Sequence, residues 1–315
     1  MHVFVAGATG VLGRAVIPRL LEAGHRVSGL ARTPEKLLIV QGLNAEPVRG
    51  DILDGDGLSR LLLQLRPDMV VNVATSIPLK LKIDPRDWEP NDRVRNVGTI
   101  NLVRACEAAG VSLLIQESVG YVCASQGAKW ITEESPRSTA PFLKATVEME
   151  DIVRASPVPG VLLRLGALMS ADSWHTQQSA AGLRRGMLPI LGDGSAYLSL
   201  IHVEDAASAI VGAIEHASVT AGRTYNIADG SPAPMAEVFR FAAASLNAPA
   251  PKSVPPFLAR MAVGALTVDI LAASYRMSAD RAQAEIGFVP RYPTYRETWK
   301  QIAGALANTD IAFSL

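Results

Sequence analysis

The 315-residue sequence contains only two cysteines, Cys106 and Cys123. Two cysteines cannot form the disulfide framework of a small secreted domain, and neither lies in the paired Cys/His spacing of a zinc site. The first ten residues also lack the basic flank, long apolar run and cleavage site of a signal peptide. We therefore predict a cytoplasmic protein without a metal site.

An excess of charge and an unbroken apolar run are also missing. Thirty Lys and Arg residues balance thirty Asp and Glu residues, so no long-range field attracts a nucleic acid, and any anion must be bound by local donors. The longest apolar stretch, residues 255–274, is interrupted by Arg260 and Asp269. We expect a helix of a globular lobe there and not a membrane span. Neither nucleic acid nor membrane is an expected partner.

The first half of the chain alternates short apolar runs with segments whose apolar residues recur every three or four positions. This alternation predicts an α/β fold with a Rossmann-type, doubly wound parallel sheet. After residue 165 the alternation loosens. We predict a dinucleotide-binding domain over residues 1–165 and a mainly substrate-binding C-terminal lobe over 166–315, with some segments returning to the Rossmann core. The expected strands lie at 2–6, 26–31, 46–50, 68–74, 112–118 and 160–166.

Three glycines, Gly7, Gly10 and Gly13, follow the first expected strand and open a helical segment. Glycines let the backbone turn tightly and approach a pyrophosphate, which then lies against the free N–H groups of the helix. A lone glycine triplet is weak evidence, but its position after the first strand of an alternating pattern favours a dinucleotide site. The predicted phosphate-binding residues are Gly7, Ala8, Thr9, Gly10, Val11, Leu12 and Gly13.

Arg32 stands at the end of the second expected strand, where an NAD-binding site carries an acidic residue. A guanidinium group at this point can bind a 2′-phosphate and stack on adenine. We therefore expect NADP(H) in preference to NAD(H). The alternative is a solvated surface arginine without a function.

These features resemble the extended short-chain dehydrogenase/reductase family, the NAD(P)-dependent epimerase/dehydratase group. The likeness runs through nearly the whole chain, in "GATGVLG", "RGDILD", "NVATSIP", "NVGTINLVRAC", "GDGSAYLSLIHVEDAASAI", "TYNIADG" and "RAQAEIGFVPRY". It implies that Asp51 and Ile52 flank the adenine and that Asn96 helps to order the active-site backbone. It further implies that Val73, Ala74 and Thr75 line the path to the nicotinamide.

The chain departs from this family at the catalytic dyad. The family uses a Tyr-x-x-x-Lys pair, in which the lysine lowers the pKa of the tyrosine so that the phenol transfers a proton near neutral pH. No Tyr-x-x-x-Lys occurs in this sequence. One matching places Phe142 and Thr146 at the two positions, and another matches Lys144 to the lysine and places Ala140 at the tyrosine. Both matchings leave out the phenol.

Three residues are candidates for the missing chemistry. Ser118 is a candidate for the strand-end hydroxyl, although the likeness places Val119 at that position and Ser118 one residue earlier. Tyr121 could act as a relocated acid or pack in the core. Lys144 could steer a carbonyl group or a ribose, or could be solvated.

Substrate contacts are expected from Phe142 as a pocket wall and from His175 in a polar loop. Arg184 and Arg185 could hold an anionic group such as a diphosphate, with a solvated helix end as the alternative. Asp205 is expected to cap a helix.

The sequence thus predicts an NADP(H)-dependent oxidoreductase with an atypical site, acting on a small polar or polyketide-like carbonyl compound, and allows a homodimer. Two alternatives remain open. One is a non-redox enzyme that uses the dinucleotide as a structural group, and the other is a non-catalytic NADP(H) sensor or scaffold.

Overall fold

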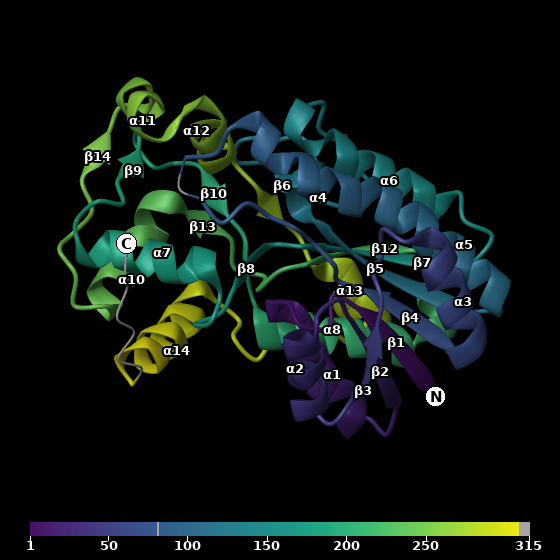
Figure 1. Cartoon of the computed structure of the whole chain (residues 1–315). Helices are drawn as coiled ribbons and strands as arrows, with labels where there is room; N and C mark the ends of the chain where they lie inside the picture. Colours follow the sequence, from purple (N-terminus) through teal and green to yellow (C-terminus); the bar gives the residue numbers. More distant parts are fainter. Residues whose placement is uncertain (81, 309–315) are drawn as a thin grey trace.

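The computed structural model describes residues 1–80 and 82–308 and divides into two lobes (Figure 1). The larger lobe is built on a seven-stranded parallel sheet in the order β12-β7-β5-β4-β1-β2-β3. The predicted doubly wound fold is confirmed. Its strands are β1 (His2–Ala6), β2 (Arg26–Ala31), β3 (Glu46–Arg49), β4 (Met69–Asn72), β5 (Leu113–Val119), β7 (Gly160–Leu165) and β12 (Thr224–Ile227).

The strand order reverses at β1, because β2 and β3 lie on one side of it and β4, β5, β7 and β12 on the other. In open α/β sheets, ligands bind outside the carboxyl ends of the strands at such a switch point. The loop after β1 therefore lies where a ligand is expected.

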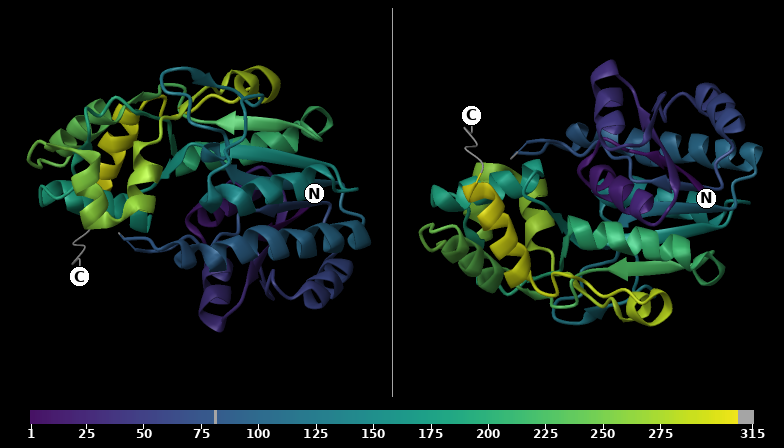
Figure 2. Two further views of the ribbon diagram at one scale, coloured as in Figure 1. Left: turned by 90° about the horizontal axis from the view of Figure 1, so that it is seen from above. Right: turned by 90° about the horizontal axis from the view of Figure 1, so that it is seen from below.

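Helices cover both faces of the sheet (Figure 2). Buried apolar residues of α1, α8 and α13 form a core with one face, and those of α3, α5 and α6 form a core with the other. The bounds are α1 (Val11–Glu22), α2 (Pro34–Gly42), α3 (Gly55–Leu65), α5 (Thr99–Ala109), α6 (Lys144–Arg154), α8 (Val203–Glu215), α9 (Ala217–Thr220) and α13 (Asp280–Ile286). Short turns around them are η1 (Pro85–Trp88), α4 (Glu89–Arg93), η2 (Val94–Gly98), η3 (Gly120–Val122) and η4 (Pro141–Leu143).

The smaller lobe packs α7, α10 and α14 around a separate apolar core. Its helices are α7 (Trp174–Arg184), α10 (Met235–Ser245), α11 (Pro256–Val263), α12 (Ala265–Ala272) and α14 (Tyr295–Ala307). Four two-stranded pairs complete it and join it to the larger lobe: β8 (Ala167–Met169) with β11 (Leu200–His202), β9 (Ile190–Leu191) with β14 (Ser253–Val254), β10 (Tyr197–Leu198) with β13 (Ala233–Pro234), and β6 (Trp130–Ile131) with β15 (Arg276–Met277).

The apolar stretch 255–274 does not form the single helix that we expected. It forms α11 and α12, which are separated by Gly264 at φ +88°. Throughout the part of the chain that the structure describes, no helix combines the length and the apolar character that crossing a bilayer requires. Because α8, β12 and α13 lie with the sheet, the division at residue 165 remains a proposal.

Candidate functional site

The loop between β1 and α1 contains three glycines, and the surrounding backbone leaves no room for a side chain at two of them. Gly7 has φ +84°, and a Cβ there would lie 2.6 Å from the backbone nitrogen of Ala74. A Cβ on Gly13 would lie 2.2 Å from the Gly7 carbonyl oxygen. The fold therefore requires both glycines. Gly10 has an ordinary extended backbone and is exposed, and its Cβ would meet only the Gly7 oxygen at 3.3 Å. The fold tolerates a side chain there more readily, so an approaching ligand is the better reason for this glycine.

The first turn of α1 offers donors to such a ligand. No side chain caps the helix, and the hydrogen bond from the Arg14 N–H to the Gly10 carbonyl, at 3.0 Å, spans its first turn. The first N–H groups of a helix have no partner within it and carry the positive end of its dipole. The loop therefore offers donors that suit a diphosphate, and diphosphate binding here stays a prediction.

Arg32 directly follows β2, and its side chain is 60% exposed. The guanidinium lies 4.0 Å from the Asp51 carboxylate. Asp51 also accepts a hydrogen bond from the Leu53 N–H at 3.0 Å, and Ile52 is buried. These residues adjoin the end of β2 and can hold an adenosine group. An exposed arginine also suits a surface position, so its role remains a prediction.

Residues 73–75 follow β4, and the first two lie against the glycine loop, because the Val73 carbonyl and the Ala74 N–H are close to Gly7. Asn72 holds this turn: its Oδ1 accepts from the Ala74 N–H at 3.1 Å, and its Nδ2 donates to Gln116 at 2.8 Å. We did not predict Asn72 or Gln116 as site residues. The sequence feature that could have indicated them is the presence of an amide side chain on each of two strands that we expected to be buried.

Asn96 lies in η2, a π-helical turn, and its Nδ2 donates to Glu148 of α6 at 2.7 Å. Single π-turns inside helices are frequent at functional sites. Next to Asn96, the guanidinium of Arg95 pairs with Glu117 at 2.8 Å, and both side chains are buried. Asn96 thus links η2 to α6, and its role in ordering the active-site backbone stays a prediction.

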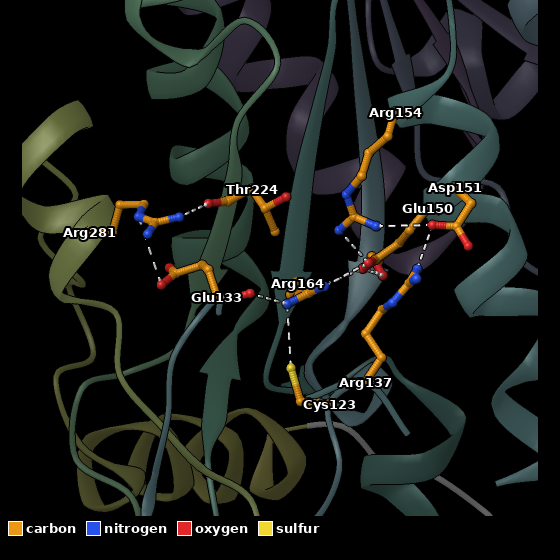
Figure 3. Close-up of polar contacts among 10 residues, drawn as sticks. Cys123, Glu133, Arg137, Glu150, Asp151, Arg154, Arg164, Thr224 and Arg281 are labelled. Atoms are coloured by element: carbon orange, nitrogen blue, oxygen red, sulfur yellow. Dashed lines mark hydrogen bonds and ion pairs between the residues drawn. The ribbon is translucent and has the colours of Figure 1, made fainter. Parts of the chain in front are cut away.

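Ser118 points into the protein core. Its side chain is fully buried and its hydroxyl donates to Glu150 Oε1 at 2.8 Å. Glu150 also accepts from Arg164 at 2.7 and 2.9 Å and from Arg154 at 2.8 Å (Figure 3). Burial raises the pKa of Glu150, but the hydrogen bonds and charge of Arg164, together with Ser118 and Arg154, bring it below its ordinary value. We therefore withdraw Ser118 as a catalytic candidate, because its hydroxyl is committed to this network.

Tyr121 lies in η3 and packs against Tyr275, with ring centroids 4.7 Å apart. Burial, and to a smaller degree Tyr275, raises the pKa of its phenol. The lysine candidate does not offset this, because Lys144 is 77% exposed and pairs with Glu148 at 3.7 Å. A phenol with a raised pKa is a weaker acid, so the structure adds no support to a catalytic Tyr121 or Lys144.

The two candidate pairs for the dyad positions, Phe142 with Thr146 and Ala140 with Lys144, differ in burial. Phe142 lies in η4 directly before α6, and Thr146 is buried one turn later. Thr146 lies on the same helix face as buried Glu150, which is four residues further on. Lys144 points to solvent instead. Which of the two pairs stands at the dyad positions stays a prediction, and both matchings lack the phenol.

The ring of Phe142 lies 6.4 Å from that of Trp88 in η1, a neighbour that we did not predict. His175 is exposed in the first turn of α7, and its ring lies edge-on to Trp174. Phe142 and His175 therefore stay candidates for substrate contact.

Arg184 and Arg185 lie exposed at the other end of α7, about 15 Å from its start. This is the position of a solvated basic helix end, and the structure adds nothing to a substrate role. Asp205 does not cap α8, and that prediction is wrong. His202 caps the helix, while Asp205 accepts from the N–H groups of Arg291 and Tyr292 at 2.7 and 3.0 Å.

A doubly wound sheet with an open glycine loop after its first strand defines a nucleotide-binding α/β protein. The sequence matches the NAD dependent epimerase/dehydratase family over residues 3–228. The chain is 31% identical over 306 residues to the 3-diazoavenalumate denitrifying reductase of a Streptomyces species, a match that covers 94% of this chain and 98% of the relative. It is also 25% identical over 284 residues to the 2-alkyl-3-oxoalkanoate reductase of Stenotrophomonas maltophilia, covering 84% and 82%.

Two solved structures share the fold. Human epimerase family protein SDR39U1 with NADPH aligns with a TM-score of 0.81 at 21% identity, covering 96% of this chain and 99% of that one. UDP-glucose 4-epimerase from Bifidobacterium longum, in complex with NAD+ and UDP, aligns with a TM-score of 0.77 at 20% identity, covering 98% and 99%. The chain belongs to the NAD dependent epimerase/dehydratase family.

Proposed function

We propose that this protein is an NADP(H)-dependent reductase that delivers hydride to a small molecule without a side-chain phenol as acid. The observation that carries the proposal is the absence of any Tyr-x-x-x-Lys from the sequence, and we match the i, i+4 pair Phe142 and Thr146 to the dyad positions of a family that uses tyrosine and lysine. Neither side chain can donate a proton near neutral pH, since a benzyl group has none to give and an alcohol holds its proton too tightly.

The cofactor assignment is supported by the fit of the loop. The exposed backbone of Gly10 and the uncapped start of α1 suit a diphosphate, and Arg32 suits a 2′-phosphate. NADPH supplies a hydride when it is bound. The chain supplies the loop that holds it, the Asn72 turn behind the nicotinamide path, and the Asn96 link to α6.

The lack of a phenol affects which class of hydride acceptor the site suits. A carbonyl carbon that accepts hydride becomes an alkoxide and needs a proton, so losing a positioned acid costs about 10²–10⁴ in rate. When the carbon of a diazonium group accepts hydride, a C–H bond forms and the C–N bond breaks. The two electrons of the C–N bond leave with N₂. That exchange consumes no proton. Similarity to a denitrifying reductase of a diazo compound supports this acceptor class for the present chain.

A carbonyl acceptor is the second candidate, supported by similarity to 2-alkyl-3-oxoalkanoate reductases. The proton must then come from water or from Tyr121. If Tyr121 were the acid, Tyr121→Phe would reduce turnover by about 10²-fold. We expect a smaller reduction, because burial raises the pKa of the Tyr121 phenol and makes it a weaker acid.

The test combines purified protein and NADPH with aryl diazo compounds and with 3-oxoalkanoates. We expect NADPH oxidation with the diazo compounds, one N₂ released per NADPH, and deuterium from labelled NADPH on the product carbon. Oxidation with the oxoalkanoates alone would select the second candidate. Binding of NADPH without oxidation by either class would favour the sensor or non-redox alternatives.

A further inference from the structure

Four residues connect the glycine loop to the start of the C-terminal lobe. Arg14 of α1 donates from Nη1 to the Thr9 carbonyl oxygen at 2.7 Å and from Nη2 to the Asp172 carboxylate. Ser170 donates its hydroxyl to the other oxygen of Asp172. Ser170 and Asp172 lie between β8 and α7, far from the loop in sequence. We call this chain of contacts, Thr9–Arg14–Asp172–Ser170, the Arg14 relay.

The relay fixes one peptide group of the loop. The carbonyl of the Thr9–Gly10 peptide is held by Arg14, while its N–H donates to the Gly7 carbonyl at 3.0 Å. Both ends of this peptide are therefore oriented before any ligand arrives, and the free N–H groups of α1 follow directly. Donors that are already oriented bind an anion more tightly, because less freedom is lost on binding.

We infer that Arg14 is a positioning residue of the dinucleotide site and that Asp172 couples this site to the segment that begins α7. That segment, residues 170–177, contains Trp174 and His175, and His175 is a candidate for substrate contact. By linkage, whatever orders it strengthens dinucleotide binding, and dinucleotide binding orders it in turn. The inference rests on dinucleotide binding at the glycine loop, as proposed above, and not on the reaction.

The charge of Asp172 lets the direction of a change in NADPH affinity test this inference. Burial raises the pKa of Asp172, but its hydrogen bonds with Ser170 and Arg14 bring the pKa below its ordinary value, so the group is a carboxylate at neutral pH. A carboxylate close to a diphosphate site disfavours an anionic ligand by charge alone. If Asp172 acts only through its charge, its removal tightens NADPH binding. If Asp172 orients Arg14, its removal weakens binding.

The experiment measures NADPH dissociation constants by calorimetry for wild type, Arg14→Ala, Asp172→Ala and the double variant. We expect each single change to weaken binding about three- to tenfold, the scale of one partly exposed hydrogen-bonded ion pair. The double variant should bind no more weakly than Arg14→Ala. Arg14→Lys keeps the positive charge but lacks a planar guanidinium that donates to Thr9 and Asp172 at once. Its NADPH affinity should lie between those of wild type and Arg14→Ala.

Arg19→Ala is the matched control. Arg19 lies on the same helix and pairs with Glu204 at 2.6 Å with similar exposure, but it does not contact the loop carbonyl. It should leave NADPH affinity unchanged, and melting temperatures of the ligand-free variants verify folding.

Hydrogen exchange of residues 170–184 gives a second readout that needs no turnover. NADPH should slow exchange there in wild type and not in Asp172→Ala. Equal or tighter binding by Asp172→Ala, or additive effects in the double variant, would overturn the inference. Absence of turnover in a protein that still shows these couplings would refute the proposed reaction only.

Discussion

Gly10 is the glycine of the loop that the fold needs least, which makes it a probe of the ligand. Gly10→Val places a branched side chain in the space that a diphosphate needs, while its Cβ meets the protein only at 3.3 Å. We expect NADPH binding to be lost and the melting temperature to change little, as calorimetry and thermal unfolding will measure. Gly13→Ala is the contrasting variant and should destabilise the chain itself, since its Cβ would lie 2.2 Å from a carbonyl oxygen. Undiminished binding by folded Gly10→Val would contradict the assignment.

The predicted preference for NADP(H) over NAD(H) rests on Arg32. Arg32→Ala removes the only expected contact with a 2′-phosphate, so NADPH binding should weaken by about tenfold while NADH binding stays constant. Calorimetry with both dinucleotides measures the ratio. Arg60→Ala, an exposed arginine on α3, is the control. Tighter binding of NADH than of NADPH by the wild type would show that the preference is wrong.

Phe142 and Thr146 allow the dyad to be rebuilt. Phe142→Tyr with Thr146→Lys restores a phenol and an ammonium group four residues apart, and the cation lowers the pKa of the phenol. We expect reduction of 3-oxoalkanoates to rise by about 10²-fold, the usual contribution of a positioned acid. Phe142→Tyr alone lacks the cation and should gain less. A folded double variant without any gain would mean that these positions do not face the acceptor.

At the scale of elements, the Glu150 network attaches α6 to the sheet. Glu150→Ala leaves Arg164 buried without its carboxylate partner, and breaking a buried ion pair typically costs about 3–5 kcal/mol of unfolding free energy. Ser118→Ala removes one hydrogen bond and should cost about 1 kcal/mol. Urea unfolding measures both. If Ser118 were catalytic after all, Ser118→Ala would instead abolish turnover in a protein of nearly normal stability.

The Glu150 network also shows which features of the fold and the site the sequence could not predict. The bounds of β1 and β2 follow from apolar runs and agree with the prediction. The direction of Ser118 depends on Glu150 and Arg164, which lie far along the chain, and no local pattern reveals that meeting. The four residues of β12 are too few to show periodicity. Likewise, a pair of helices looks like one helix until the backbone of Gly264 is known.

For the molecule as a whole, Asp229 makes stability depend on pH. Burial raises its pKa from 3.8 to about 7 against the opposing effect of the hydrogen bond from the Ser231 N–H, and Asp205 and Glu297 add smaller raising contributions. The folded state thus binds more protons than the unfolded state between pH 3.8 and about 7. Stability therefore falls across this range as pH rises and levels off above it.

Asp229→Asn removes this dependence. It should raise the unfolding free energy by on the order of 1–4 kcal/mol at pH 8 and by little below pH 4. Thermal unfolding from pH 4 to 8 measures the difference, and Asp56→Asn, an exposed residue of α3, serves as control. An equal effect of Asp229→Asn at both ends of the range would rule out the titration.

The position of β12 in the sheet also governs how the chain is made. During synthesis, β7 remains an open edge until residues 224–227 leave the ribosome, because β12 is the strand that pairs with its free side. Exposed edges invite pairing with other chains, and contacts between distant segments form slowly. A nascent chain of this protein therefore passes through a long interval in which its central sheet is incomplete, and dependence on chaperones should be greatest there. A chain released at residue 165 has no later strand to close that edge and should aggregate.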